Sequence, residues 1–252
     1  MTSRTRSRLA WLALACAVSL ALPGRAIHAQ QTGAKNSPDL SGSYERYRGT
    51  PATPTAPPPP LKPPYLQEWQ AQVRAAREAD AKGEPLAAGV VACLPEGMPG
   101  MMAGPFPMEI LQSKGQVTVI QEAYNQVRRI LLDQPQKPID DVDPGFYGRS
   151  VGRWEGDTLV VDTVGIKENV RYQNVPHSKD VRIKERIRSV APDIVWDEIT
   201  IEDSVILEKP WTFTFAYKRM PGYTLLEYIC EDNREYADEQ GRQKIRIAPP
   251  AR

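Results

Sequence analysis

Two titratable side chains, His177 and Glu185, have the types and surroundings that acid-base chemistry requires. His177 is the one histidine after residue 29, and an imidazole titrates near neutral pH, so it can accept or donate a proton. Glu185 alternates with isoleucines, and desolvation raises the pKa of a carboxyl group among aliphatic side chains. The structural alternatives are a turn histidine bonded to backbone, and an internal ion pair between Glu185 and Arg128 or Arg129. An extended chain would hold His177 and Glu185 up to ~26 Å apart, so they meet only if the chain folds back.

A set of aromatic side chains could bind an apolar ligand. Alternate residues of one strand share a face. A turn at Pro221-Gly222 would bring Tyr228 of the next strand onto the same face. The expected aromatic face consists of Trp211, Phe213, Phe215, Tyr217, Tyr228 and, from an earlier hairpin, Trp154. In a small barrel this face is either the core or the wall of a cavity. Arg128 and Tyr124 are expected to bind a polar group of the ligand.

The hairpin of residues 148–164 is the clearest element that could position these side chains. Two strand-like runs meet at Gly156-Asp157, a dipeptide that suits the turns matching strand twist. Counting outward from this turn pairs Trp154 with Leu159. A later three-residue turn at 191–193 pairs Glu185 with Ile199, which places the carboxylate on an otherwise aliphatic inner face.

The rest of the chain from residue 106 also has the pattern of short strands. We expect nine strands, at residues 108–113, 116–123, 126–132, the two arms of the 148–164 hairpin, 181–190, 193–203, 211–219 and 225–231. Sequential hairpins predict a mainly β fold, either an antiparallel up-and-down barrel or a strongly curled sheet. An amphipathic helix is expected at residues 65–82, so helix and barrel together span residues 65–232, before a charged tail at 233–252.

The N-terminal residues indicate export. Three arginines precede an apolar run at residues 9–22, and a small residue, Ala29, suits cleavage. We expect residues 1–29 to be a signal peptide and the mature protein to be periplasmic or secreted. The apolar run is shorter than the roughly 20 residues of a membrane-spanning helix. A lipid anchor at Cys16 is the alternative.

The composition after residue 29 limits the classes of binding partner that we expect. Removal of residues 1–29 leaves a net charge of about −3, which favours neither nucleic acid nor anionic lipid as a partner. The remaining cysteines, Cys93 and Cys230, predict a disulfide in an oxidising compartment. Residues 30–64 are polar and then rich in proline, which predicts an extended arm.

A segment rich in methionine, proline and glycine follows at residues 93–105. Met98, Met101 and Met102, with Cys93 nearby, could form a soft site for copper(I). Methionines also fill irregular apolar space. We expect the segment to be an apolar plug under or beside the sheet.

Several blocks resemble a family of secreted, largely uncharacterised bacterial proteins. They are GRWEGDTLVVDT at residues 152–163, CLPEGMP at 93–99, NQVRRI at 125–130, PHS at 176–178 with Glu185-Arg186, and EYICE at 227–231. The resemblance spans roughly residues 65 to 232. The 148–164 hairpin is also similar to those of the calycin barrels, the lipocalins and fatty-acid-binding proteins. That similarity implies a lipocalin-like barrel around a small apolar ligand.

These observations lead to one hypothesis and one alternative. The first is an exported, cofactor-free barrel that binds a small hydrophobic, ring-containing molecule. The alternative is a metal-independent acid-base enzyme (an isomerase, dehydratase or lyase) in the same cavity, with His177 as base and Glu185 as acid. A third hypothesis, an interaction protein acting through the proline-rich arm, leaves the aromatic face unexplained. The sequence does not define the oligomeric state.

Overall fold

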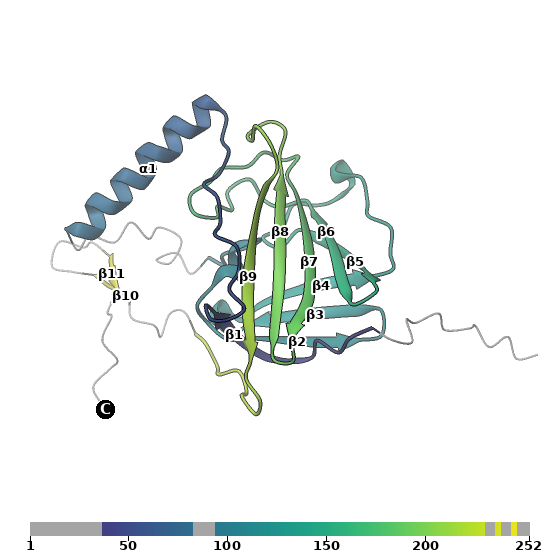
Figure 1. Ribbon diagram of the computed structural model, residues 1–252. Helices are drawn as coiled ribbons and strands as arrows, with labels where there is room; N and C mark the ends of the chain where they lie inside the picture. The colour runs from purple at the N-terminus through teal and green to yellow at the C-terminus, as the bar shows by residue number, and fades with distance from the viewer. Residues whose placement is uncertain (1–36, 83–93, 230–234, 238–242, 246–252) are drawn as a thin grey trace, which may run out of the picture. The chain divides into compact units, whose positions relative to one another are not determined.

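Nine strands of the chain close into one β-barrel (Figure 1). The computed structural model describes residues 37–82, 94–229, 235–237 and 243–245. Each strand pairs with its neighbours in chain order, and β1 closes the barrel between β2 and β9. The strands are β1 (Gly42–Tyr47), β2 (Met108–Ser113), β3 (Gln116–Gln121), β4 (Gln126–Leu132), β5 (Arg149–Glu155), β6 (Thr158–Val164), β7 (Arg182–Ala191), β8 (Ile194–Glu202) and β9 (Trp211–Arg219).

Helices are few in the part of the chain that the structure describes. Helix α1 spans Pro63–Ala81 and the short helix α3 spans Gly100–Ala103, with 3-10 turns at Ala123–Asn125 and Ile139–Asp141. Two three-residue strands, β10 (Glu235–Ala237) and β11 (Gln243–Ile245), pair with each other outside the barrel sheet. Among the described residues, no helix has the length and apolar character that a membrane crossing requires.

The registers predicted for the central hairpins are confirmed. Trp154 pairs with Leu159 across the β5–β6 turn, and Glu185 pairs with Ile199 across the β7–β8 turn. These registers hold because a one-residue slip would turn every inner side chain outward. Figure 1 shows β7, β8 and β9 side by side along one wall of the barrel.

Three features of the predicted topology are wrong. Part of the expected arm forms β1, which inserts Tyr44 into the core with no exposed surface. The pairing of β4 with β5 is parallel, because the long connection at residues 133–148 carries the chain back before β5 begins. The expected strand at 225–231 is absent over its described residues, because β1 occupies the edge of β9 where that strand would pair.

Side-chain hydrogen bonds, instead of pairing with a neighbouring strand, hold the segment that follows Tyr223. Glu122 accepts hydrogen bonds from the Tyr223 hydroxyl and from the backbone N–H of Leu226, both at 2.8 Å. Asn125 donates to the carbonyl of Tyr228 at 2.7 Å. The predicted signal peptide at 1–29 and the predicted Cys93–Cys230 disulfide fall on residues outside the described ranges.

The methionine-rich segment is an apolar plug, as predicted. Met98, Met101 and Met102 are each at most 2% exposed and belong to the main core cluster. The barrel wall binds the backbone of this plug, since Gln121 donates to the carbonyl of Met101 at 2.7 Å and the Tyr217 hydroxyl donates to the carbonyl of Met102 at 2.8 Å. The plug therefore fills space that an empty barrel would leave for a ligand.

Gly152 gives a test of how tightly the inner wall packs. A Cβ at this position would lie 2.8 Å from Ile130 Cγ2 and 3.3 Å from Leu159 Cδ1. Gly152→Val should therefore lower the free energy of unfolding by about 1 to 3 kcal/mol, because a packed core does not absorb added carbon atoms. Urea unfolding measures the change. The control is Arg153→Val on the exposed face, for which a loss as large as that of Gly152→Val would show that inner packing is not the cause.

Candidate functional site

The inner face of β9 carries the predicted aromatic wall. Trp211, Phe213, Phe215 and Tyr217 are all buried. Ring centroids lie 4.9 Å apart for Trp211 and Phe213, and 5.2 Å apart for Phe213 and Phe215. These rings therefore contact one another directly. Trp154 packs at the edge of the same core and is only partly buried.

Tyr172, which the sequence reasoning missed, adds a ring to this wall from a loop. Its ring stacks on Phe213 at 5.2 Å and lies 5.8 Å from Trp211. The two residues after it, Gln173 and Asn174, have positive φ values of 53° and 62°, which bends the backbone into a tight turn. The Gln173-Asn174 pair was the available sequence signal, because asparagine tolerates this left-handed conformation.

Helix α1 holds this turn in place. The indole N–H of Trp69 donates to the carbonyl of Gln173 at 2.9 Å. Tyr65 and Leu66 of the same helix pack against the core cluster. The helix therefore positions the loop that carries Tyr172, which gives it a structural connection to the aromatic wall.

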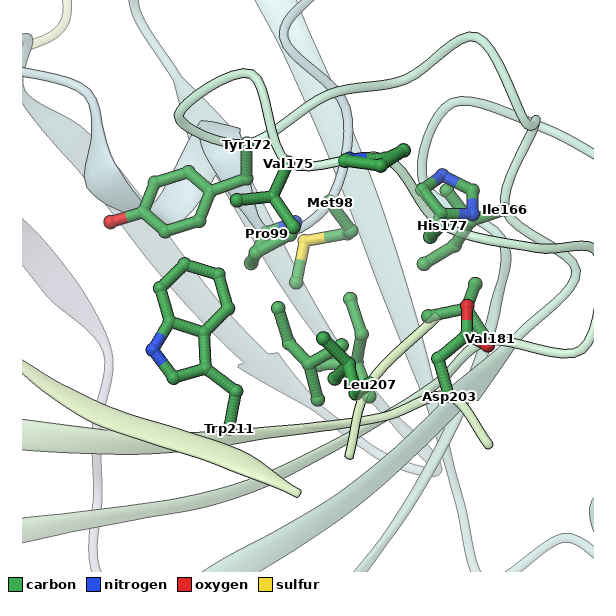
Figure 2. Close-up of a pocket in the computed structure, with 13 residues that line it drawn as sticks. Met98, Pro99, Ile166, Tyr172, Val175, His177, Val181, Asp203, Leu207 and Trp211 are labelled. Carbon is green, nitrogen blue, oxygen red and sulfur yellow. The ribbon is translucent and has the colours of Figure 1, made fainter. Parts of the chain in front are cut away.

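A small cavity of about 20 Å³ lies behind Tyr172 at the mouth of the barrel (Figure 2). Figure 2 shows Tyr172 and Trp211 at one end of this cavity and His177 and Asp203 at the other. The apolar lining between them includes Met98 and Leu207. A cavity of this volume has room for about one water molecule. The rings predicted to line a ligand cavity thus fill most of it themselves.

Tyr172 also lines an open groove of about 620 Å³. Tyr172 lines both this groove and the inner cavity, so the two spaces adjoin at this residue. The groove also contains Tyr124, one of the predicted ligand-binding residues, together with Phe146 and Arg171. Tyr228 lies outside the aromatic wall, with its ring 5.2 Å from Tyr124 and 5.9 Å from Phe106.

His177 lies at the polar end of the inner cavity. Its Nδ1 is 2.9 Å from the carbonyl oxygen of Ser178, as in the turn alternative. Its Nε2 is buried and has no hydrogen-bond partner among the described residues. Burial lowers the pKa of His177 below its ordinary value, and the cationic Arg171 acts in the same direction. The Ser178 carbonyl and the carboxylates of Asp203 and Glu168 act in the opposite direction on this pKa.

Asp203, beside His177, accepts hydrogen bonds from three backbone N–H groups and one hydroxyl group. Its carboxylate accepts hydrogen bonds from the N–H and hydroxyl of Ser178 at 2.6 and 3.0 Å. It also accepts from the N–H groups of Val205 and Ile206 at 3.0 and 3.1 Å. These contacts fasten the loop before β7 to the loop after β8, so Asp203 fixes the position of His177.

Deeper in the barrel, Glu185 forms the predicted ion pair with Arg128. Arg128 donates from Nη1 to Glu185 Oε1 at 2.8 Å and from Nη2 to Oε2, and the two side chains are 1% and 0% exposed. Ser150 and Thr163 accept the other guanidinium hydrogen bonds, at 3.1 and 3.0 Å. Burial alone would lower the pKa of Arg128, but Glu185 raises it above its ordinary value.

A second buried carboxyl group, Asp197, lies next to this pair. Asp197 is 0% exposed, and neither of its oxygens accepts a hydrogen bond from an N–H or hydroxyl group of the described residues. Burial, and then the charge of Glu185, raise the pKa of Asp197 well above its ordinary value, although Arg128 and Arg46 oppose this. Burial and Asp197 also raise the pKa of Tyr217. The environment therefore favours a protonated Asp197.

The structure gives His177 and Glu185 different partners. His177 belongs to the mouth, with Ser178 and Asp203 as neighbours. Glu185 belongs to the interior, where Arg128 occupies both of its oxygens. No group of three or more His, Cys, Asp or Glu side chains in the described part of the chain is arranged to hold a metal ion. The two spaces around Tyr172 together define a candidate small-molecule site.

Comparison with known protein families finds none that matches this chain, and no curated protein matches it either. The class of protein supported here is therefore a closed, mainly β barrel of nine strands with a candidate site at its mouth.

Proposed function

We propose that this protein binds a small, apolar, ring-containing molecule at the mouth of the barrel, and that the Tyr172 side chain moves aside to admit it. The observation that carries the proposal is that Tyr172 lines both the 620 Å³ groove and the inner cavity. A groove of this size is typical of small-molecule sites, which range over about 300 to 1,000 Å³. A ligand ring would replace the Tyr172 ring against Phe213 and Trp211.

The arrangement of Tyr172 supports exchange with a ligand. Its ring comes from a loop instead of a barrel strand, and it is only partly buried. Each aromatic pair it forms adds about 0.5 to 1.5 kcal/mol beyond area burial. A ligand ring of similar size would make the same contacts. Displacement of the Tyr172 ring would therefore cost little net interaction free energy.

We also propose that the protein acts after export, like the secreted bacterial proteins that its sequence blocks resemble, and that its barrel serves as a calycin-like carrier. The arginine-rich start and apolar run of residues 1–29 support this compartment. A barrel that binds an apolar molecule at its mouth would be suited to carry it through water.

Replacement of Tyr172 by alanine tests the binding proposal. Tyr172→Ala should bind 4-methylanisole about tenfold more tightly than the native chain, because the ligand no longer displaces a stacked ring. An apolar cavity on the order of 150 Å³ binds benzene, so the opened site is expected to accept a single ring. Isothermal titration calorimetry of the full-length chain measures both affinities.

Tyr47→Ala is the matched control for this measurement. Tyr47 is partly buried on β1, and its hydroxyl donates to the carbonyl of Thr50 at 3.0 Å, away from both spaces. Its loss should leave the affinity for 4-methylanisole unchanged. If 4-methylanisole binds neither the native chain nor Tyr172→Ala, the proposed function is overturned.

A further inference from the structure

The protonation of the His177 ring follows from its neighbour. Nδ1 lies 2.9 Å from the Ser178 carbonyl oxygen, and a carbonyl can only accept a hydrogen bond, so Nδ1 must carry the proton. Burial favours the neutral ring, and a neutral imidazole has one N–H and one lone pair. Nε2 is therefore an acceptor.

This acceptor is unused, and its ring lines the inner cavity. Nε2 is buried without a hydrogen-bond partner among the described residues. The imidazole lines the 20 Å³ cavity, and Figure 2 shows it beside Ile166 with Val181 and Asp203 at the same end. A buried polar atom left without a partner has lost its hydrogen bond to water and gained none in the protein, which is unfavourable. Such an atom at the end of a pocket indicates a missing donor.

The protein's own nearby groups do not supply this donor. The Ser178 hydroxyl already donates to Asp203, and the Asp203 carboxylate accepts four hydrogen bonds. A ligand carboxylate would bring a further negative charge beside Asp203, and it offers no proton to Nε2. A neutral hydroxyl group meets both requirements.

We infer that the ligand is a ring compound with a hydroxyl group, a phenol or a ring alcohol, and that the hydroxyl donates to Nε2 of His177. This inference rests on the proposed function, because the ring of the same ligand takes the place of Tyr172. His177 and Tyr172 line opposite ends of one cavity. The hydroxyl group would occupy the 20 Å³ space while the ring lies on Phe213 and Trp211.

Two probes that differ by one methyl group test the inference. 4-Methylphenol has a hydroxyl donor, and 4-methylanisole has the same ring with the oxygen capped. The full-length chain and Tyr172→Ala should both bind 4-methylphenol about fivefold more tightly than 4-methylanisole, the usual contribution of one net hydrogen bond. His177→Phe should remove this preference, and His177→Gln, which retains an acceptor oxygen, should restore part of it.

The outcomes separate the inference from the proposed function. Equal affinities for the two probes in the native chain and in Tyr172→Ala would overturn the hydroxyl assignment and leave ring binding intact. A preference for 4-methylphenol that persists in His177→Phe would overturn the role of His177. If neither probe binds even to Tyr172→Ala, the proposed function fails, and the inference fails with it.

Nitrogen-15 NMR provides a readout that does not depend on the folding of a His177 variant. The chain contains two histidines, so a full-length His28→Gln protein reports on His177 alone. The free protein should show a protonated Nδ1 and an unprotonated Nε2, and 4-methylphenol should shift the Nε2 resonance while 4-methylanisole does not. A spectrum with the proton on Nε2 would overturn the inference.

Discussion

Arg128→Met is expected to lower the free energy of unfolding by about 3 to 5 kcal/mol. The substitution leaves the Glu185 carboxylate at 0% exposure without its cation, and an uncompensated buried charge is strongly destabilising. Ser150 and Thr163 also lose the guanidinium that binds them. Urea unfolding followed by circular dichroism measures the loss as a fall in the midpoint at constant slope.

A double-mutant cycle separates the cost of an unpaired charge from the value of the pair. Arg128→Met with Glu185→Leu removes both charges, and a buried pair replaced by apolar residues is often nearly neutral. The double variant should therefore regain most of the stability that either single variant loses. Arg153→Met, which breaks an ion pair whose side chains are 62% and 38% exposed, should change stability by less than about 1 kcal/mol. An additive cycle would contradict the proposed dependence of Glu185 on Arg128.

Asp197→Asn is expected to make the protein more stable as the pH rises, relative to the native chain. The folded-state pKa of Asp197 is raised above its ordinary value of 3.8 by burial and by Glu185. Above about pH 4, the native protein therefore binds more protons at this residue than the unfolded chain does, and its stability falls with rising pH. The slope is at most about 1.4 kcal/mol per pH unit. Asparagine, which does not ionise, removes this term.

The native chain and Asp197→Asn share every other titrating group. The difference between their free energies of unfolding therefore reports on the Asp197 carboxyl group alone. Urea unfolding from pH 4 to pH 8 should show a gap that widens and then becomes constant above the folded-state pKa. Asp203→Asn is the matched control, since its carboxylate has backbone and hydroxyl donors and its loss should destabilise. A gap for Asp197→Asn that is independent of pH would show that Asp197 ionises normally in the fold.

Turn residues and the alternation of apolar side chains are sufficient to predict the strand pairing in the central sheet. The turn at Gly156-Asp157 and the alternation of apolar residues predicted the β5–β6 register, and the turn at 191–193 predicted the β7–β8 register. The inward position of Glu185 followed from that register, and Arg128 was correctly named as a possible partner. The same register also places Asp197 inside the barrel, since it pairs with Ile187 on the inner face.

Features that depend on distant parts of the chain escaped prediction. Strand β1 has one fully buried apolar side chain, Tyr44, so its local pattern resembles that of a polar arm. Tyr172 lies in a loop, where no periodicity indicates burial. The residues after Tyr223 have a good strand pattern, but β1 has already taken the edge of β9. Competition between segments for one edge cannot be read from either segment alone.

The seam between β1 and β9 determines when during synthesis the barrel can be completed. The Arg219 side chain donates to the carbonyl of Ser41, 178 positions earlier in the chain. A chain that emerges with its N-terminus first presents β1 long before either partner strand exists. Long-range pairing of this kind is slow, and until it occurs β2 and β9 have bare edges that can pair with another chain. The aggregation-prone species is therefore a nearly finished, unclosed sheet, and rapid capture of β1 protects the newly made protein.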